Sequence, residues 1–197
     1  MTDSLEITMA HCLQRAGECG REEFLREFPN PVVVLVGPEE DEVERFGTLE
    51  HGDFSEIPKI SRNQLLRDSS LVFPLAKRGS VNNFASMVVI GRADNCDIII
   101  ANNRVSKCHA IVRMQRSLRF VSPGTEDPTD MEPAKSTMTD GGSTNGTIVN
   151  GKKLKAGEFH ELTNGDQISL GPTVNMVFFN ANDFYTLLSP NSDEAGS

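Results

Sequence analysis

From Leu71 onward, short apolar runs alternate with turn residues at intervals of about 8–12 residues. This spacing is typical of an antiparallel sandwich or barrel, because each short strand must reverse before the next one can pair with it. We expect strands at 71–75, 87–91, 97–100, 109–115, 118–121, 147–149, 153–154, 159–161, 167–170 and 174–179. The sequence therefore predicts a mainly β fold, with an antiparallel β-sandwich over residues 69–182.

Two dipeptides mark tight reversals within this sandwich. Asn150-Gly151 is the stronger one, because both residues tolerate positive φ. Ile148-Val149 and Lys153-Leu154 can therefore pair across a two-residue type I′ hairpin. Gly165-Asp166 predicts a second reversal before the last two strands.

The first third of the chain has a different pattern of apolar and polar residues. Residues 3–28 carry a weak amphipathic pattern interrupted at Gly17 and Gly20, which predicts two short helices. Residues 32–36 form a continuous β-branched run, which predicts one buried strand. We expect 1–68 to be a smaller N-terminal region of unknown role, which either docks on the sandwich or forms a separate partner-binding element.

Two further segments have no strand pattern. Residues 122–139 contain three prolines and no hydrophobic period, which predicts a long loop. Residues 183–197 predict a short closing helix at 183–188 followed by a flexible polar tail.

Charge and cysteine content limit the class of protein. The net charge of −9 argues against nucleic-acid or anionic-membrane binding, which draw on clustered Lys and Arg. No apolar run approaches the ~18–20 residues that cross a bilayer, and the first residues lack the pattern of a signal peptide. The four cysteines form no CxxC pair, which favours free thiols in a reducing compartment. We expect a cytoplasmic protein.

Three segments at the ends of expected strands carry polar residues whose chemistry converges on an anion. They are Gly91-Arg92, residues 104–109 (RVSKCH) and residues 143–147 (STNGT). A guanidinium matches phosphate oxygens, and Ser and Lys add a hydroxyl donor and a point charge. Residues 102–119 contain five basic residues and no acidic one, in contrast to the acidic chain.

Four motifs in register resemble those of the forkhead-associated (FHA) domain family. They are GR at 91–92, SxxH at 106–109, STNGTxVNG at 143–151 and LxxGDxIxLG at 162–171. The FHA domain is a β-sandwich that reads phosphothreonine, and the resemblance extends over about residues 70–180. It implies an FHA-like sandwich without catalytic residues, a metal or a cofactor.

The resemblance also implies a role for individual residues. The phosphothreonine-binding residues are Arg92, Ser106, Lys107, Thr144 and Asn145. Arg104 is the contact to the residues that flank the phosphothreonine. The structural residues of the motifs are Gly91, His109 and Gly146.

This site predicts a phosphothreonine-dependent adaptor in kinase signalling. The partner would be a phosphothreonine-containing protein or peptide, such as a Ser/Thr kinase or its substrate. A phosphorylation-independent assembly scaffold is the alternative. An enzyme is disfavoured, because residues 1–68 show no catalytic cluster.

Other interpretations of the same residues are weaker. Ser106, His109 and Asp140 could form a hydrolase triad, but the strained nucleophile turn is not apparent. Cys96 and Cys108 could bind a metal with His109, but no fourth ligand is sensibly spaced. Cys108 beside Lys107 could have a lowered pKa, although an ordinary thiol is favoured.

The insertion at 122–139 departs from the family pattern, in which a short connection precedes the STNGT turn. Asp140 is the acid that the family often places there. Thr125 and Thr129 lie beside acidic residues and prolines. We therefore hypothesise that one of them, once phosphorylated, competes in cis with an external ligand.

Overall fold

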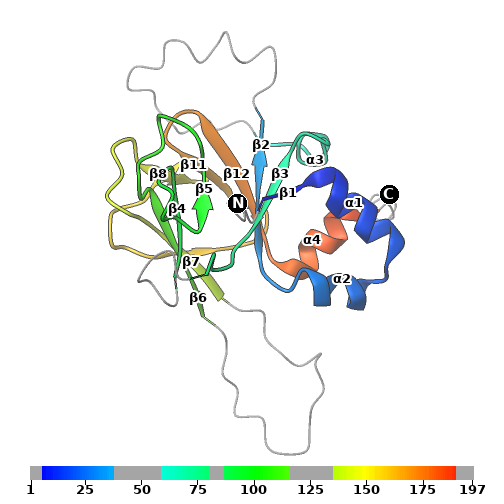
Figure 1. Ribbon diagram of the computed structural model, residues 1–197. Coiled ribbons are helices and arrows are strands. Elements are labelled where there is room, and N and C mark those ends of the chain that lie inside the picture. The colour runs from blue at the N-terminus through cyan, green and yellow to red at the C-terminus, as the bar shows by residue number, and fades with distance from the viewer. Residues whose placement is uncertain (1–5, 38–58, 80–86, 116–134, 190–197) are drawn as a thin grey trace, which may run out of the picture.

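The computed structural model describes residues 6–37, 59–79, 87–115 and 135–189. Two β-sheets face each other, and helices cover the outer side of one sheet (Figure 1). The predicted mainly β sandwich, with N-terminal helices and a strand before it, is confirmed. None of the helices within these ranges is long and apolar enough to cross a membrane.

The larger sheet has seven strands, and its spatial order differs from the chain order. The strands are β1 (Ile7–Thr8), β2 (Val32–Val36), β3 (Leu71–Pro74), β8 (Thr147–Val149), β9 (Lys152–Lys153), β11 (Gln167–Leu170) and β12 (Val174–Phe179). Their order across the sheet is β1-β3-β2-β12-β11-β8-β9. All their pairings are antiparallel.

The smaller sheet has five strands. They are β4 (Met87–Gly91), β5 (Ile98–Ile99), β6 (Ala110–Gln115), β7 (Lys135–Asp140) and β10 (His160–Leu162). Their order is β10-β7-β6-β4-β5, and the β4–β5 pair is parallel. The smaller sheet therefore combines antiparallel pairs with one parallel pair, at the edge formed by β5.

Alternating side chains from both sheets fill the space between them. This sandwich core includes Val33, Phe73, Val88, Ile90, Val112, Met138, Ile168, Met176 and Phe178. Each such side chain contributes about 1.5–3 kcal/mol when it is removed from water. The core holds rigid the strand ends from which the polar loops leave.

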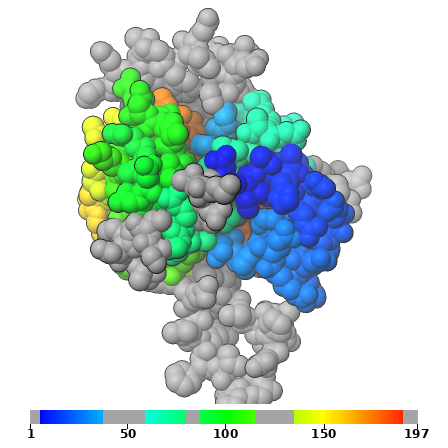
Figure 2. Space-filling model, in the orientation of Figure 1, coloured from blue at the N-terminus to red at the C-terminus, as the bar shows by residue number. Residues whose placement is uncertain are grey.

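A second core lies between the larger sheet and the helices α1 (Met9–Glu18), α2 (Arg21–Glu27) and α4 (Ala181–Leu188). Phe24 packs at 4.6 Å from Phe28 and at 6.3 Å from Phe184, measured between ring centroids. In the space-filling view, the blue N-terminal helices pack directly against the turquoise segment that contains β3 (Figure 2). The described part of residues 1–68 therefore docks on the sandwich.

The burial of strand β2 on both of its sides explains why its sequence is apolar at consecutive positions. Val33 faces the sandwich core, whereas Val32 and Val34 face the helices, so both sides of the strand are buried. β2 pairs with β12 on one side and with β3 on the other. The sheet therefore contains strands from both sides of the predicted boundary between residues 68 and 69.

The N-terminal helices differ in detail from the prediction. Ile7–Thr8 is a strand rather than part of a helix, and Thr8 caps α1 by accepting a hydrogen bond from the His11 amide. Gly17 lies within α1 and does not interrupt it. Its cost of about 1 kcal/mol is offset by the packing of the buried α1 face on the sheet. The break between α1 and α2 falls at Gly20, as predicted.

The predicted loop at 122–139 is wrong at its end, because residues 135–140 form β7. Ser136, Met138 and Asp140 are buried, but only one of them is apolar, so the sequence shows no hydrophobic period. Pairing with β6 and β10 stabilises the strand instead. The expected strand at 118–121, the insertion up to residue 134 and the tail from residue 190 lie outside the described residues.

The other expected strands are present. Those at 32–36, 87–91, 147–149, 167–170 and 174–179 have the predicted bounds. The remaining ones differ from the expected bounds by one residue, at one end or at both ends. The Asn150-Gly151 turn is the predicted hairpin, with φ of 49° and 80° and with Ile148 opposite Lys153.

Candidate functional site

Three loops meet beside the ends of β4, β6 and β8. The Arg92 amide donates a hydrogen bond to the Ser106 carbonyl at 3.1 Å, and the Thr144 amide donates one to Ser106 Oγ at 3.0 Å. Asn145 Nδ2 donates to the Arg104 carbonyl at 2.7 Å. We call these residues, Arg92, 104–107 and 143–146, the three-loop rim. Predicted site residues that are far apart in sequence are neighbours here.

The charged side chains of the rim face solvent. Arg92, Arg104 and Lys107 are exposed, whereas Ser106 and Asn145 are half-buried. The nearby Asp97 is buried and forms an ion pair with Lys77 at 2.8 Å. The rim thus presents cationic groups around a hydroxyl and an amide.

Ser106 is oriented through both its backbone and its side chain. Its hydroxyl oxygen accepts from the Thr144 amide, so the hydroxyl hydrogen stays available for donation to a ligand. Its amide donates to His109 Nδ1 at 3.0 Å. The neighbouring loops therefore hold Ser106 in place and leave its hydroxyl hydrogen free to be donated.

The buried His109 side chain connects two loops of the rim. Because Nδ1 accepts the Ser106 amide, Nε2 carries the ring proton and donates it to the Gly146 carbonyl at 3.0 Å. Burial lowers the pKa of His109, against the raising effects of the Gly146 carbonyl and the Asp140 charge. The imidazole is therefore neutral near pH 7.

Asp140, at the end of β7, organises the STNGT turn. Its carboxylate accepts the Gly142 and Ser143 amides at 2.9 Å each, Ser143 Oγ at 2.6 Å and Thr147 Oγ1 at 2.8 Å. Burial raises its pKa, but these hydrogen bonds outweigh burial and hold the pKa below its usual range. The sequence gives one signal for this role, an acidic residue directly before a Gly-Ser-Thr-rich turn.

Two positions of the rim require glycine, Gly91 because backbone segments approach closely and Gly146 because its φ is positive. A Cβ on Gly91 would lie 2.3 Å from the Lys107 carbonyl oxygen, so no other residue fits there. Gly146 has φ of 88°, a conformation that residues with side chains rarely adopt. Its carbonyl accepts from both His109 and the Gly171 amide, at 3.0 and 2.9 Å.

The same contacts argue against a hydrolase triad. His109 receives the Ser106 amide rather than its hydroxyl, and the Asp140 carboxylate binds Ser143 and Thr147. A nucleophile would need its hydroxyl hydrogen-bonded to the histidine ring.

A metal site is no better supported. Both ring nitrogens of His109 have protein partners. Within the described ranges, no group of three or more His, Cys, Asp or Glu side chains is placed to bind a metal. Burial, followed by the Asp140 charge, raises the pKa of Cys108, so the idea of a lowered pKa is wrong.

Comparison with known proteins gives a family match over part of the sandwich. Residues 88–171 match the family model of the FHA domain. A search of curated proteins finds no sequence that matches the chain.

Several solved structures are similar to the chain. The MEK1 FHA domain in complex with a HOP1 phosphothreonine peptide is 24% identical, with 55% of this chain and 87% of that chain covered and a TM-score of 0.38. The N-terminal FHA domain of S. cerevisiae Rad53p, bound to a phosphothreonine peptide, is 22% identical, with coverages of 58% and 88% and a TM-score of 0.40. The Slr1951 protein from Synechocystis sp. is 19% identical, with coverages of 76% and 96% and a TM-score of 0.42.

Proposed function

We propose that the chain is a phosphothreonine-dependent peptide-binding protein, on the premise that residues 88–171 match the FHA domain family. The FHA family is known for binding phosphothreonine peptides. The observation that carries the proposal is the contact of Ser106 with two other loops of the rim, through Arg92 and Thr144. These contacts join the backbone of Arg92 to the loop of Ser106 and to the turn of Thr144 and Asn145, which supports a site shared by the three loops.

The phosphate would be held by charge-assisted hydrogen bonds. Arg92 offers a planar fork of N–H donors, Ser106 its unused hydroxyl hydrogen and Lys107 a mobile ammonium group. A phosphothreonine carries a charge of about −1.5 to −2 and three acceptor oxygens. Removal of the phosphate would leave these donors without a partner and release the peptide.

The peptide backbone would be held by the neighbouring turn. Asn145 uses one N–H to bind the Arg104 carbonyl, which leaves a second N–H and the side-chain oxygen for an extended peptide. Thr144 is exposed next to it. Since hydrogen bonds already order the rim, binding would cost little conformational entropy.

We extend the proposal to the cellular setting. The partner is a phosphorylated Ser/Thr kinase or one of its substrates, and the chain acts as a cytoplasmic adaptor in kinase signalling. FHA domains are binding modules, so we propose that this chain binds and does not catalyse. The four cysteines, all free thiols in the structure, support a reducing compartment.

The test is a degenerate phosphothreonine peptide library titrated against the wild-type chain and Arg92→Ala. We expect selective binding by the wild type and at least a tenfold loss, about 1.4 kcal/mol, in Arg92→Ala. Arg26→Ala is the matched control, because Arg26 is an exposed arginine on α2. Equal binding of unphosphorylated peptides would contradict the proposal and favour the assembly scaffold.

A further inference from the structure

The hairpin of β8 and β9 carries a lysine beside the three-loop rim. A Cβ added to Gly146 would lie 2.4 Å from Lys153 Cε and 3.0 Å from Lys153 Nζ. The Lys153 side chain therefore lies across Gly146, directly next to Asn145 in the chain. None of the four motifs singles out this lysine.

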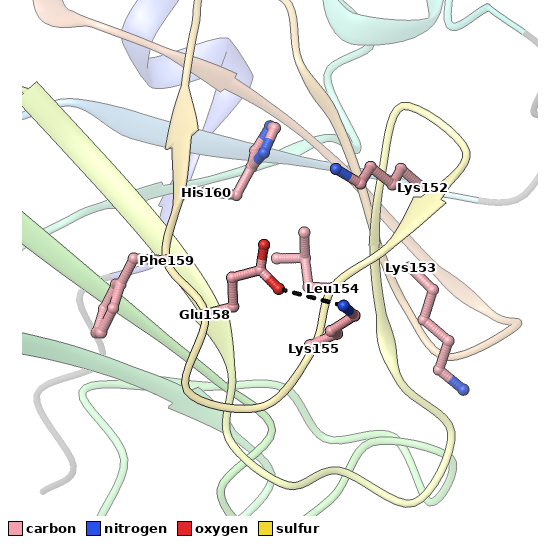
Figure 3. A pocket seen from close by; sticks show the side chains of 7 residues that line it. All are labelled: Lys152, Lys153, Leu154, Lys155, Glu158, Phe159 and His160. Atoms are coloured by element: carbon pink, nitrogen blue, oxygen red, sulfur yellow. Dashed lines mark ion pairs between the residues drawn. The ribbon is translucent and has the colours of Figure 1, made fainter.

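The two lysines of β9 leave the hairpin in opposite directions. In the close-up, Lys152 and Lys153 point to different sides of the strand, and Lys153 points away from Glu158 and His160 (Figure 3). Neighbouring side chains on a strand alternate in this way. The neighbouring residues Lys152 and Lys153 thus differ in orientation but not in charge.

The ammonium group of Lys153 is available to a ligand. Lys153 is exposed, and within the described part of the chain no carboxylate is paired with it. The nearby Lys155 differs, because it lies 3.9 Å from Glu158. A peptide held by Asn145 would pass within reach of the flexible Lys153 side chain.

We propose that Lys153 is a specificity-determining residue, which selects an acidic side chain next to the phosphothreonine. The inference rests on the proposed function, since the phosphate and Asn145 would bring the peptide to this place. The contact of Lys153 with the peptide would be separate from the contacts of the rim loops, because Lys153 comes from the β8–β9 hairpin. We expect Lys153 to bind a carboxylate of the peptide, and a second phosphate could bind there through the same attraction between opposite charges.

The experiment measures the affinity of the full chain for a set of phosphothreonine peptides by fluorescence anisotropy. One reference peptide receives a single Asp, Ala or Lys at each position that flanks the phosphothreonine. For the wild type, we expect one position at which Asp binds about 2- to 5-fold more tightly than Ala, the range for an exposed charge pair. A phosphoserine at that position distinguishes a carboxylate from a second phosphate.

Three variants isolate the lysine. Lys153→Met keeps the apolar stem over Gly146 and should abolish the preference for Asp. Lys153→Glu should invert it, so that the Lys peptide binds best. Lys152→Glu makes the same charge change on the other side of the strand and should keep the preference of the wild type.

The outcomes separate this inference from the proposed function. If the wild type binds the reference peptide and Arg92→Ala does not, the proposed function holds whatever Lys153 does. An unchanged preference in Lys153→Glu, or an equal change in Lys152→Glu, would then overturn the role of Lys153 alone. If the wild type binds no phosphothreonine peptide, both ideas fail.

Discussion

His109 connects two loops of the rim through both ring nitrogens, so its protonation affects stability. Its pKa is lowered in the folded protein, and the unfolded chain therefore takes up the proton first as the pH falls. The contribution of His109 is fully present above its ordinary value of 6.5 and decreases below it, until the folded protein is protonated as well. We expect stability to decrease below about pH 6.5 with a slope of at most about 1.4 kcal/mol per pH unit.

Denaturant titrations between about pH 7.5 and about pH 5 would measure this slope. His109→Asn is the matched variant, since it removes the titrating ring and leaves the other ionisable groups. We expect it to be less stable than the wild type at the higher pH and to depend less on pH. Parallel stability curves for the two proteins would refute the role of His109.

Asp140 supports a second prediction about single residues. Asp140→Ala leaves two amides and two hydroxyls of the STNGT turn without their acceptor. We expect a loss of about 2–4 kcal/mol in the free energy of unfolding, because hydrogen bonds to charged groups contribute about 1.5–3 kcal/mol each and water replaces part of them. Thermal unfolding measures it, with Asp68→Ala, at an exposed aspartate, as the control. Equal effects of the two substitutions would count against this role of Asp140.

Residue types and motif spacing predict much of the rim. Arg92, Ser106 and Asn145 can be selected because their donors suit an anion and because strand ends meet at one edge. The roles of Asp140 and Lys153 are not visible in the same way. For Asp140 the sequence shows only an acid before a Gly-Ser-Thr-rich turn, and its hydrogen-bond network requires coordinates, as does the side chain of Lys153 that crosses Gly146.

At the scale of elements, β2 is the strand that joins the N-terminal region to the sandwich. It lies between β3 and β12, and the match to the FHA family begins only at residue 88. Without β2, the inward-facing side of the sheet would lose Val33 and the outer side Val32 and Val34. We expect a fragment of residues 69–197 to lack cooperative unfolding, whereas the full chain unfolds cooperatively.

Near-ultraviolet circular dichroism and thermal unfolding of both proteins would test the role of β2. Val34→Ala in the full chain is a milder variant, which keeps the strand and removes part of its outer face. We expect it to cost about 1–3 kcal/mol. A fragment that unfolds with the cooperativity of the full chain would show that the sandwich does not need β2.

The sequence predicts elements best where period and turn residues agree. The prediction of the hairpin at Asn150-Gly151 is correct because both residues accept positive φ. The prediction of β2 is correct because a continuous β-branched run fits a strand that is buried on both sides. β7 is missed because its buried positions are largely polar. The helix α3 (Arg62–Leu65) is missed although Ser61 and Gln64 form a capping box that the sequence displays.

At the scale of the whole molecule, the sign of the charge differs between the rim and the chain. The net charge is −9, whereas the rim presents Arg92, Arg104 and Lys107 to solvent. A peptide residue beside the phosphothreonine meets this local positive charge, and a residue farther away meets the field of an acidic protein. The favoured charge of a flanking residue should therefore change sign with its distance from the phosphothreonine.

We test this with a reference phosphothreonine peptide that carries a run of lysines or of serines at its distant end. The lysine peptide should bind more tightly at about 0.05 M salt, and its advantage should disappear at about 0.5 M salt, where the screening length is far shorter. The wild-type affinity for both peptides should also fall, because salt screens the contact between phosphate and rim. A lysine advantage that persists at high salt would mean a direct contact with the distant residues, and equal affinities at low salt would mean that the acidic field does not reach the bound peptide.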